Sequence, residues 1–273
     1  MKKSLSILLF AGLITFVSCG PSKKGKETEL KQIESLRKDS IARLKNDLVK
    51  FKLLGKVHIY SEIKYQAVDS FGQIKKKGID EKSTIVFNDE GNVTERTILL
   101  PNDRLKSKNT YKYDNKRNKI ESSTFDSDGR LTRKLVYKFD SVGNTIEVNT
   151  YKLNGNLESK IIPICDKNGD CIEQKAYDSK GMLGLKYTYK YDKMRSIIEE
   201  KLFNPNGSLN YKYSYKNDAN RHRIEKTVFN SLDKLEDTYT YKCFHDANGN
   251  MIKQIEYKNS ILTFIKEYVI KFY

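Results

Sequence analysis

The fold is decided by the stretch YKYDNKRNKIESSTFDSDGRL, residues 111–131. It contains two aromatic–Asp pairs, Tyr113-Asp114 and Phe125-Asp126. Asp at the first position and Gly at the fourth, as in Asp126-Ser-Asp-Gly129, are typical of a type I turn followed by a glycine bulge. A segment of strand length separates the two turns. We therefore expect the middle of an antiparallel meander here.

The same pattern recurs every 26 residues along the chain. Its aligned starts are Tyr111, Tyr137, Pro163, Tyr189, Tyr215 and Tyr241. The pattern can be followed back to Phe87-Asn88, and it slips by two residues in the last unit, at Asp246 to Asn250. Self-similarity of this kind is typical of repeat architectures. About seven units over residues 57–273 therefore predict an all-β domain of tandem antiparallel β-hairpins, forming an elongated curved sheet.

Some turns depart from the pattern, and in three of them Arg117, Arg195 and Arg221 occupy the position of Gly. Gly takes a left-handed backbone conformation that a Cβ resists. We expect these three turns to be strained or of another type.

Between the turns, side chains alternate with the period of two that a strand requires. Tyr187, Tyr189 and Tyr191 share one face of their segment, and Lys190 lies on the other. We expect the aromatic face to be buried. The opposite face carries a lysine row, which consists of Lys112, Lys138, Lys190, Lys216 and Lys242.

The composition favours a basic protein with a modest core. The 273 residues include 51 Lys and Arg against 35 Asp and Glu, and 38% are hydrophobic. The 18 Tyr and 12 Phe are too many aromatic residues for a disordered chain. An excess of positive charge favours polyanionic partners, so the lysine row is a candidate site for lipopolysaccharide, an acidic glycan or, least favoured, nucleic acid. Lysines on a solvent face also prevent sheets from aggregating, which explains the row without any ligand.

The N-terminus is a targeting segment. In MKKSLSILLFAGLITFVSCG, Lys2 and Lys3 precede an apolar stretch that is too short for a stop-transfer helix. The ending Phe16-Val17-Ser18-Cys19 resembles a bacterial lipobox. The resemblance implies a signal peptide over residues 1–18 and a lipid on Cys19, which anchors the chain to a membrane of the cell envelope. An ordinary secretory signal is the alternative.

A tether and a helix are expected to follow the lipidation site. Residues 19–26 are polar, and residues 27–55 show apolar positions three or four apart, which predicts an amphipathic helix closed by Gly55. We favour a helix docked on the first strands over a stalk or a coiled coil, because the apolar stripe is short.

The tandem motif resembles the YD repeats of bacterial Rhs proteins. Phe125-Asp126-Ser-Asp-Gly129-Arg130-Leu131 is the nearest match, and the resemblance covers residues 57–273. Together with the lipobox, it suggests an Rhs/YD-repeat lipoprotein of the Bacteroidota. Large arrays in that family form shells around a C-terminal toxin. This chain has only about seven units and no distinct domain after them.

Few residues suggest catalysis or metal binding. His58, His222 and His245 are scattered in the sequence, and none stands beside a Ser or Cys in a nucleophile motif. Asp166-Lys-Asn-Gly-Asp170 spaces its oxygens as a calcium loop does, but the sixth position is Cys171 where an EF-hand needs Gly. Turn-forming Asx residues explain this pattern. We expect no enzymatic activity, no cofactor and no metal.

Cys165 and Cys171 flank one turn. With a three-residue loop they face each other, and a disulfide is then feasible in an oxidising compartment. A register that pairs Tyr113 with Ile120 and Lys112 with Glu121 is chemically tidier, but it places the two cysteines on opposite faces. The sequence leaves these two registers open.

The sequence therefore predicts a lipid-anchored, non-enzymatic β-repeat protein that serves as a binding or scaffolding surface for a protein, a glycan or a polyanionic envelope component. The alternative is an accessory or remnant of an Rhs-like toxin system, acting as a small shell or an immunity partner. A transmembrane barrel is less favoured, because the short strands carry Glu and Lys on both faces.

Overall fold

The structure, a computed structural model, describes residues 46–273. The predicted signal peptide, Cys19, the tether and most of the predicted helix lie outside the described residues. No helix among residues 46–273 has the length and apolar character needed to cross a bilayer.

Residues 46–273 form one short helix and sixteen strands. The helix is α2 (Asp47–Phe51). The strands are β1 (Val57–Ser70), β2 (Gln73–Phe87), β3 (Val93–Leu99), β4 (Leu105–Tyr113), β5 (Lys119–Phe125), β6 (Leu131–Phe139), β7 (Thr145–Tyr151), β8 (Leu157–Cys165), β9 (Cys171–Asp178), β10 (Leu183–Tyr191), β11 (Ile197–Phe203), β12 (Leu209–Asn217), β13 (Arg223–Phe229), β14 (Leu235–His245), β15 (Met251–Lys258) and β16 (Ile261–Phe272). Each strand pairs antiparallel with its sequence neighbours, as a meander of hairpins requires.

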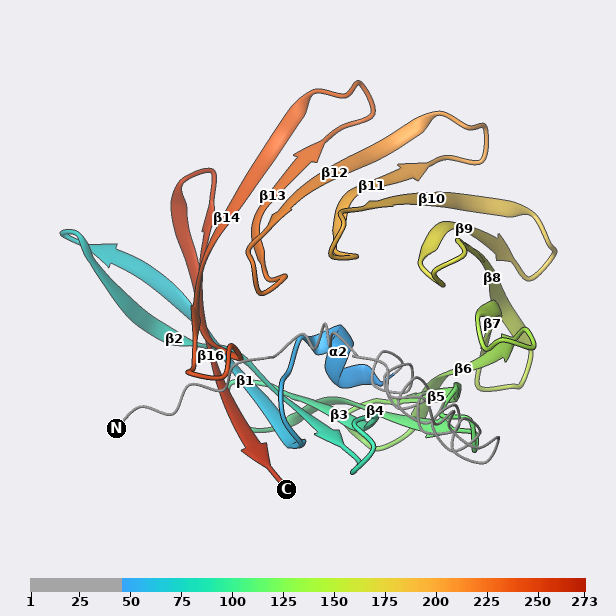
Figure 1. Cartoon of the computed structure of the whole chain (residues 1–273), viewed down its shortest axis with the longest axis horizontal. Coiled ribbons are helices and arrows are strands. Elements are labelled where there is room, and N and C mark those ends of the chain that lie inside the picture. The colour runs from blue at the N-terminus through green and yellow to red at the C-terminus, as the bar shows by residue number, and fades with distance from the viewer. Residues whose placement is uncertain (1–45) are drawn as a thin grey trace, which may run out of the picture. The chain divides into compact units, whose positions relative to one another are not determined.

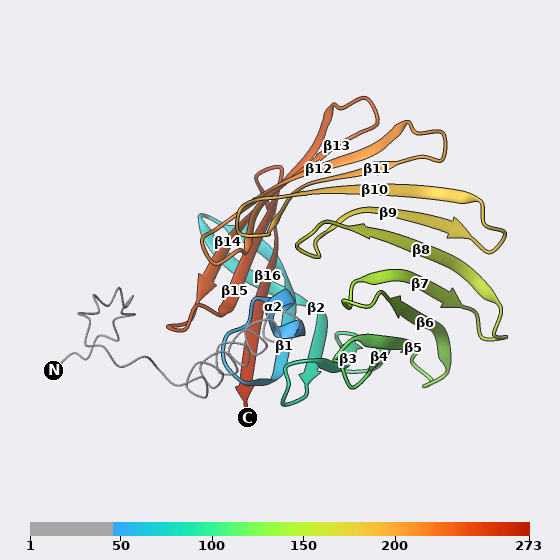
Figure 2. The same cartoon turned by 45° about the vertical axis from the view of Figure 1, so that its right-hand side comes forward.

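The sheet closes into a barrel, which corrects the expectation of an open curved sheet. β1 pairs with β2 on one side and with β16 on the other, from Val57 opposite Phe272 to Gln66 opposite Phe264. The strands form a ring in Figure 1, and Figure 2 shows the same ring obliquely. Every strand pairing in residues 57–272 contains a register shift, such as the one between Lys112 and Tyr113. A bulge bends its strand and increases its twist, and these repeated bends allow the sheet to return to its first strand.

The turns confirm the predicted turn type. In the turn between β5 and β6, the Asp126 N–H donates to Arg130 O at 3.0 Å and the Gly129 N–H donates to Asp126 O at 3.2 Å. Asp126 Oδ1 also accepts from the Arg130 N–H at 2.9 Å. The aspartate thus caps its own turn, as short polar side chains do.

The three arginine turns keep this geometry. Arg117, Arg195 and Arg221 adopt φ angles of 66°, 62° and 67°, in the left-handed region that glycine takes in most of the other turns and that Asp103 and Asp233 take in two of them. The first of the two expected outcomes, strain in an unchanged turn, is therefore observed. A Cβ in this region is unfavourable by roughly 1–2 kcal/mol.

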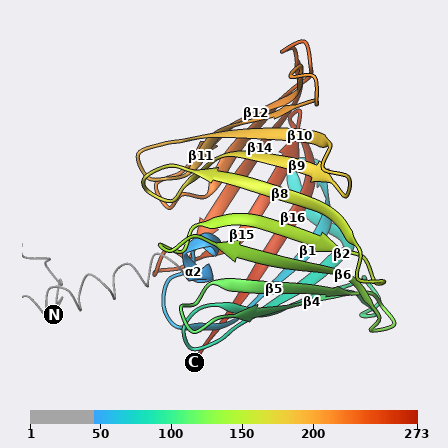
Figure 3. The ribbon, with the colours of Figure 1, turned by 90° about the vertical axis from the view of Figure 1, so that its right-hand side faces the viewer.

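Helix α2 lies against the inner face of the barrel, near one rim (Figures 1 and 3). Leu48 belongs to the main buried cluster, and its N–H donates to Gly91 O in the turn between β2 and β3. The Phe51 ring contacts Phe87 edge-on at 5.7 Å. The helix ends at Phe51, and Lys52 takes the left-handed capping position, which is earlier than the predicted end at Gly55. The described turn of helix thus docks on the first strands.

Asp47 fastens α2 to the strands. Its side chain is 4% exposed, and it accepts hydrogen bonds from the Tyr113 hydroxyl at 2.6 Å and the Val93 N–H at 3.1 Å. Lys50 at 2.9 Å and Lys119 at 3.6 Å balance its charge. Burial alone would raise the pKa of Asp47, but the charges of Lys50 and Lys119 and the Tyr113 hydrogen bond outweigh it, and the pKa lies below its usual value.

Tyr113 also defines the two faces of the sheet. Since its hydroxyl meets α2 inside the ring, the face it shares with its cross-strand partners is the inner wall. Alternation then places Lys112 and its partner Glu121 on the outer wall. Because the same register is repeated around the barrel, the side chains of the other long strands can be assigned to the inner or the outer wall in the same way.

Candidate functional site

Tyrosines dominate part of the inner wall. The register around β10, β12 and β14 brings one set to this face, and we call it the tyrosine wall: Tyr187, Tyr189, Tyr191, Tyr211, Tyr213, Tyr215, Tyr239 and Tyr241. Along β12, ring centroids stack at 6.1 Å between Tyr211 and Tyr213 and at 6.5 Å between Tyr213 and Tyr215, with interplanar angles of 15° and 13°. Tyr215 is buried, but Tyr213 is only half-buried. The expectation of a buried aromatic face therefore holds for Tyr215 but only in part for Tyr213, because the residues that the structure describes cover this part of the inner wall incompletely.

Charged groups are interspersed among these rings. Glu200 accepts the Tyr215 hydroxyl hydrogen bond at 2.9 Å. Lys226 lies over the Tyr213 ring at 4.7 Å and near the Tyr239 ring at 5.5 Å. Burial, with Arg223 adding to it, lowers the pKa of Lys226. The wall thus offers flat apolar rings together with a carboxylate and an ammonium group.

Burial keeps the hydroxyls of Tyr191 and Tyr241 protonated at neutral pH. Burial, followed by the charge of neighbouring groups, raises the pKa of Tyr191 and of Tyr241 to about 12. Tyr189 donates to Gln174 Oε1 at 3.2 Å and Tyr191 donates to Cys171 O at 2.7 Å. Neutral hydroxyls at ring edges can both donate and accept, which suits a ligand rich in hydroxyl groups.

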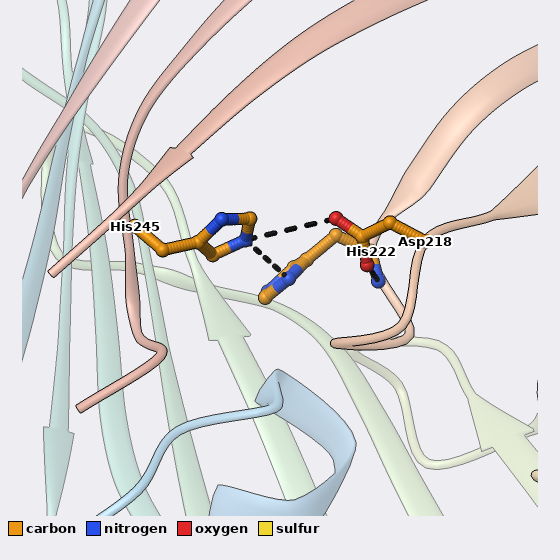
Figure 4. A group of neighbouring side chains, drawn as sticks. All are labelled: Asp218, His222 and His245. Atoms are coloured by element: carbon orange, nitrogen blue, oxygen red, sulfur yellow. Dashed lines mark hydrogen bonds and ion pairs between the residues drawn. The ribbon is translucent and has the colours of Figure 1, made fainter. Parts of the chain in front are cut away.

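A second cluster lies at the rim near α2, where two of the three histidines meet (Figure 4). Asp218 and His222 belong to the turn between β12 and β13, and His245 ends β14. His245 Nε2 lies 2.9 Å from His222 Nδ1 and 3.8 Å from Asp218 Oδ2. Burial, followed by the charge of Lys52, lowers the pKa of His222 to about 4. Two imidazoles and a carboxylate at these distances can bind a metal ion, and the two rings can exchange a proton.

The sequence expectation of scattered histidines is corrected for this pair. Strand β14 is two residues longer than β12, which is the slip seen in the last repeat. The slip moves His245 into the position beside a bulge that Tyr113 and Tyr191 occupy in earlier units. Counting the slip into the alignment would have placed His245 next to the turn that contains His222. His58 lies elsewhere, with Nδ1 3.3 Å from Phe87 O.

The predicted lysine row lies on the outer wall, where glutamates neutralise most of it. The ion pairs are Lys112–Glu121 at 2.9 Å, Lys138–Glu147 at 2.7 Å, Lys190–Glu199 at 3.0 Å and Lys216–Glu225 at 2.9 Å. Lys242 lies 5.5 Å from the Tyr257 ring centroid. These exposed pairs contribute little to stability. They do lower the local positive potential, and polyanion binding by this row stays a prediction.

The bulge resolves the register question at the cysteine turn. Cys165 pairs directly with Cys171, while Ile164 pairs with Glu173, so Ile172 is the extra residue. The same shift lets Lys112 face Glu121 and Tyr113 face Lys119. The Lys112–Glu121 pair of one register and the facing cysteines of the other are therefore both observed, whereas the expected pair of Tyr113 with Ile120 is not. The two cysteines are free thiols in the structure, and their disulfide stays a prediction.

The oxygens of the calcium-like segment serve the turn itself. Asp166 Oδ1 accepts from the N–H groups of Asn168 and Asp170 at 2.8 and 2.9 Å. Arg195 binds the Asp170 carboxylate through two nitrogens, at 2.8 and 2.9 Å. Turn formation and an ion pair thus account for this carboxylate pair.

The fold and the two clusters define a class: a sixteen-stranded antiparallel barrel of hairpin repeats with a tyrosine-lined inner wall. No family model and no curated protein matches the chain. Among solved structures, a porin-like protein from Bacteroides uniformis ATCC 8492 is similar, with 12% identity over 79% of this chain and 96% of that chain and a TM-score of 0.52. This likeness supports the barrel fold.

Two further solved structures match with lower TM-scores. A porin-like protein from Bacteroides vulgatus ATCC 8482 is 12% identical over 79% of this chain and 98% of that chain, with a TM-score of 0.35. The TcdB2-TccC3 structure is 12% identical over 76% of this chain and 14% of that chain, with a TM-score of 0.33.

Proposed function

We propose that the chain is a lipid-anchored, non-enzymatic binding protein of the cell envelope, whose tyrosine wall holds a glycan. The observation that carries the proposal is the stacked series Tyr211, Tyr213 and Tyr215, which remains partly exposed on the inner wall. Aromatic rings left open to solvent inside a barrel present apolar area and hydroxyl groups together.

The spacing of the rings favours an extended ligand. Neighbouring rings lie 6.1 and 6.5 Å apart along β12, and the tyrosines of β10 and β12 are two strands apart, or about 9.5 Å. A chain of linked sugars presents a flat apolar face at repeated intervals, and its hydroxyls can reach Glu200 and Lys226. A repeat protein supplies the same side chain many times, which suits a polymer better than a single small molecule.

The envelope location rests on the lipobox-like segment at Cys19, with support from the porin-like description of the similar Bacteroides uniformis protein. The outer wall carries Lys–Glu ion pairs beside the turns, such as Lys138–Glu147, and also in the middle of β6, where Lys134 pairs with Glu121. A membrane-spanning barrel carries an apolar band on its outer face. We therefore place the barrel in water, held to the membrane by the acyl chains. Replacement of Cys19 by Ala is expected to abolish acyl labelling and to release the protein from washed membranes.

The binding role is tested with a glycan array made from envelope polysaccharides, followed by titration of each positive glycan. Tyr213→Ala removes the central ring of the stack and is expected to weaken binding at least about tenfold. Tyr151→Ala is the matched control, because Tyr151 pairs with Lys134 on the outer wall. Circular dichroism must show that both variants are folded. A glycan that binds Tyr213→Ala as tightly as the wild type would refute the inner-wall site.

A further inference from the structure

The geometry at the rim points to a metal site: we propose that Asp218, His222 and His245 bind a divalent d-block cation, with Zn²⁺ as the reference ion. The three side chains come from two neighbouring hairpins, and their ligand atoms lie within 4.8 Å of one another (Figure 4). Imidazole nitrogens and one carboxylate are a donor set that zinc takes in proteins. The proposal is independent of the glycan-binding role.

The distances fit a tetrahedral ion. Zinc–nitrogen and zinc–oxygen bonds of about 2.0–2.1 Å place two ligand atoms about 3.3 Å apart at a tetrahedral angle. The separations of His245 Nε2 from His222 Nδ1 and from Asp218 Oδ2, 2.9 and 3.8 Å, bracket that value. The ligand atoms of His222 and Asp218 are the more widely separated pair, within 4.8 Å, so an ion bound by all three side chains requires these two to approach each other by about 1 Å. The ring that holds the shared proton must change tautomer, so that its proton moves through solvent to its other nitrogen and both rings bind the ion as neutral imidazoles.

The ligands are held in place by the turn. Asp218 Oδ1 accepts the N–H groups of His222 at 2.8 Å and Asn220 at 2.9 Å, which fixes the carboxylate and leaves Oδ2 toward His245. His222 is 5% exposed, so packing limits its side-chain freedom. Fixed orientation of ligands is what raises affinity at metal sites.

The repeats show what this turn would contain without a ligand role. In the equivalent turns, Asn118 and Asn144 occupy the position of His222, and their amides donate to Oδ2 of Asp114 and Asp140 at 3.0 and 2.9 Å. The amide thus completes the turn by itself. In the turn between β12 and β13, the His222 imidazole replaces this amide. Asp218 Oδ2, the oxygen that the amide would bind, faces the His245 imidazole instead. Turn formation does not account for this pair of histidines.

One group opposes the ion. Lys52, the left-handed residue that ends α2, lies close enough for its charge to act on His222 and Asp218. Asp218 supplies the single carboxylate among the three ligands, so the site carries little negative charge. We expect micromolar affinity for this reason, with the fourth coordination position left to water.

The experiment is calorimetric titration of the tag-free mature protein with ZnCl₂, accompanied by absorption spectra with CoCl₂. One equivalent of Zn²⁺ is expected to bind, and Co²⁺ is expected to give tetrahedral d–d bands without an intense sulfur-to-cobalt band. His222→Asn and His245→Tyr introduce residues that other repeats carry at these positions, so both variants are expected to fold. Each should weaken Zn²⁺ binding at least about tenfold, since it removes a ligand.

His58→Asn is the matched control, because it removes the remaining histidine, which lies outside the cluster. It should leave Zn²⁺ affinity unchanged. Loss of binding in His58→Asn, unchanged binding in His222→Asn and His245→Tyr, absence of stoichiometric binding, or a sulfur-to-cobalt band that places the ion on a thiol would each overturn the proposal. Circular dichroism of all three variants distinguishes ligand loss from unfolding.

Discussion

Replacement of Asp47 by Asn is expected to destabilise the barrel strongly, because this carboxylate joins α2 to the strands. The side chain is 4% exposed, and it accepts from the Val93 N–H at 3.1 Å and the Tyr113 hydroxyl at 2.6 Å. Removing one member of a buried ion pair costs about 3–5 kcal/mol, and here the value is reduced because Lys50 is largely exposed. We expect a loss of about 3 kcal/mol at pH 7. For a domain of this size, that loss lowers Tm by about 6–12 °C.

The effect depends on pH with a defined sign. The pKa of Asp47 is lowered in the folded protein, so its ionised form stabilises the fold at every pH above the unfolded value of 3.8. This contribution is lost as the pH falls through the folded pKa. The difference in Tm between wild type and Asp47→Asn should therefore be constant from pH 5 to 7 and should decrease below about pH 4.

Thermal unfolding followed by circular dichroism measures both effects. Asp128→Asn is the control, because Asp128 is exposed and makes one surface ion pair with Arg130 at 3.3 Å. It should change stability by less than about 0.5 kcal/mol. A loss of only about 0.5 kcal/mol would lower Tm by 1–2 °C. A Tm of Asp47→Asn within that range of the wild type would therefore show that α2 is not held by this carboxylate.

Two further predictions concern the turns. Oxidation should join Cys165 to Cys171, which are direct cross-strand partners, and stabilise the fold by about 2 kcal/mol. Intact mass under non-reducing conditions and Tm with and without reductant measure this effect. Two free thiols that persist under oxidising conditions would contradict it. Arg117→Gly should stabilise the fold by up to about 1 kcal/mol, because Gly adopts the φ of 66° without strain and the exposed ion pair with Glu90 contributes little. Denaturant unfolding measures this change, and a midpoint lower than that of the wild type would contradict the prediction.

Much of the local structure could be predicted from the sequence, because it depends on contacts between residues close in the chain. The Asp126–Gly129 turn forms through bonds within five residues, so its residue types suffice to identify it. The alternation that separates Tyr191 from Lys190 follows from strand geometry alone. These features repeat with the 26-residue period, and each repeat confirms the others.

The candidate sites were harder to predict, because they combine residues from different hairpins. His222 and His245 are 23 residues apart, and their contact depends on a two-residue lengthening of β14. Likewise, the pairing of glutamates with Lys112 and its equivalents depends on the bulge in each strand. A bulge changes which residues share a face, and it leaves little trace in the hydrophobic pattern.

The sequence by itself determined the hairpin repeat, the turn type and the two faces of each strand, because these follow from backbone preferences and a period of two. Tertiary structure decided whether the array remains open or closes. Closure requires β1 and β16, from opposite ends of the domain, to meet in register after the curvature of fourteen intervening strands has accumulated. Small bends at each bulge add up over that distance, so no single repeat specifies the outcome. Closure in turn makes the tyrosine face an inner wall, and it brings the rim turns together around α2.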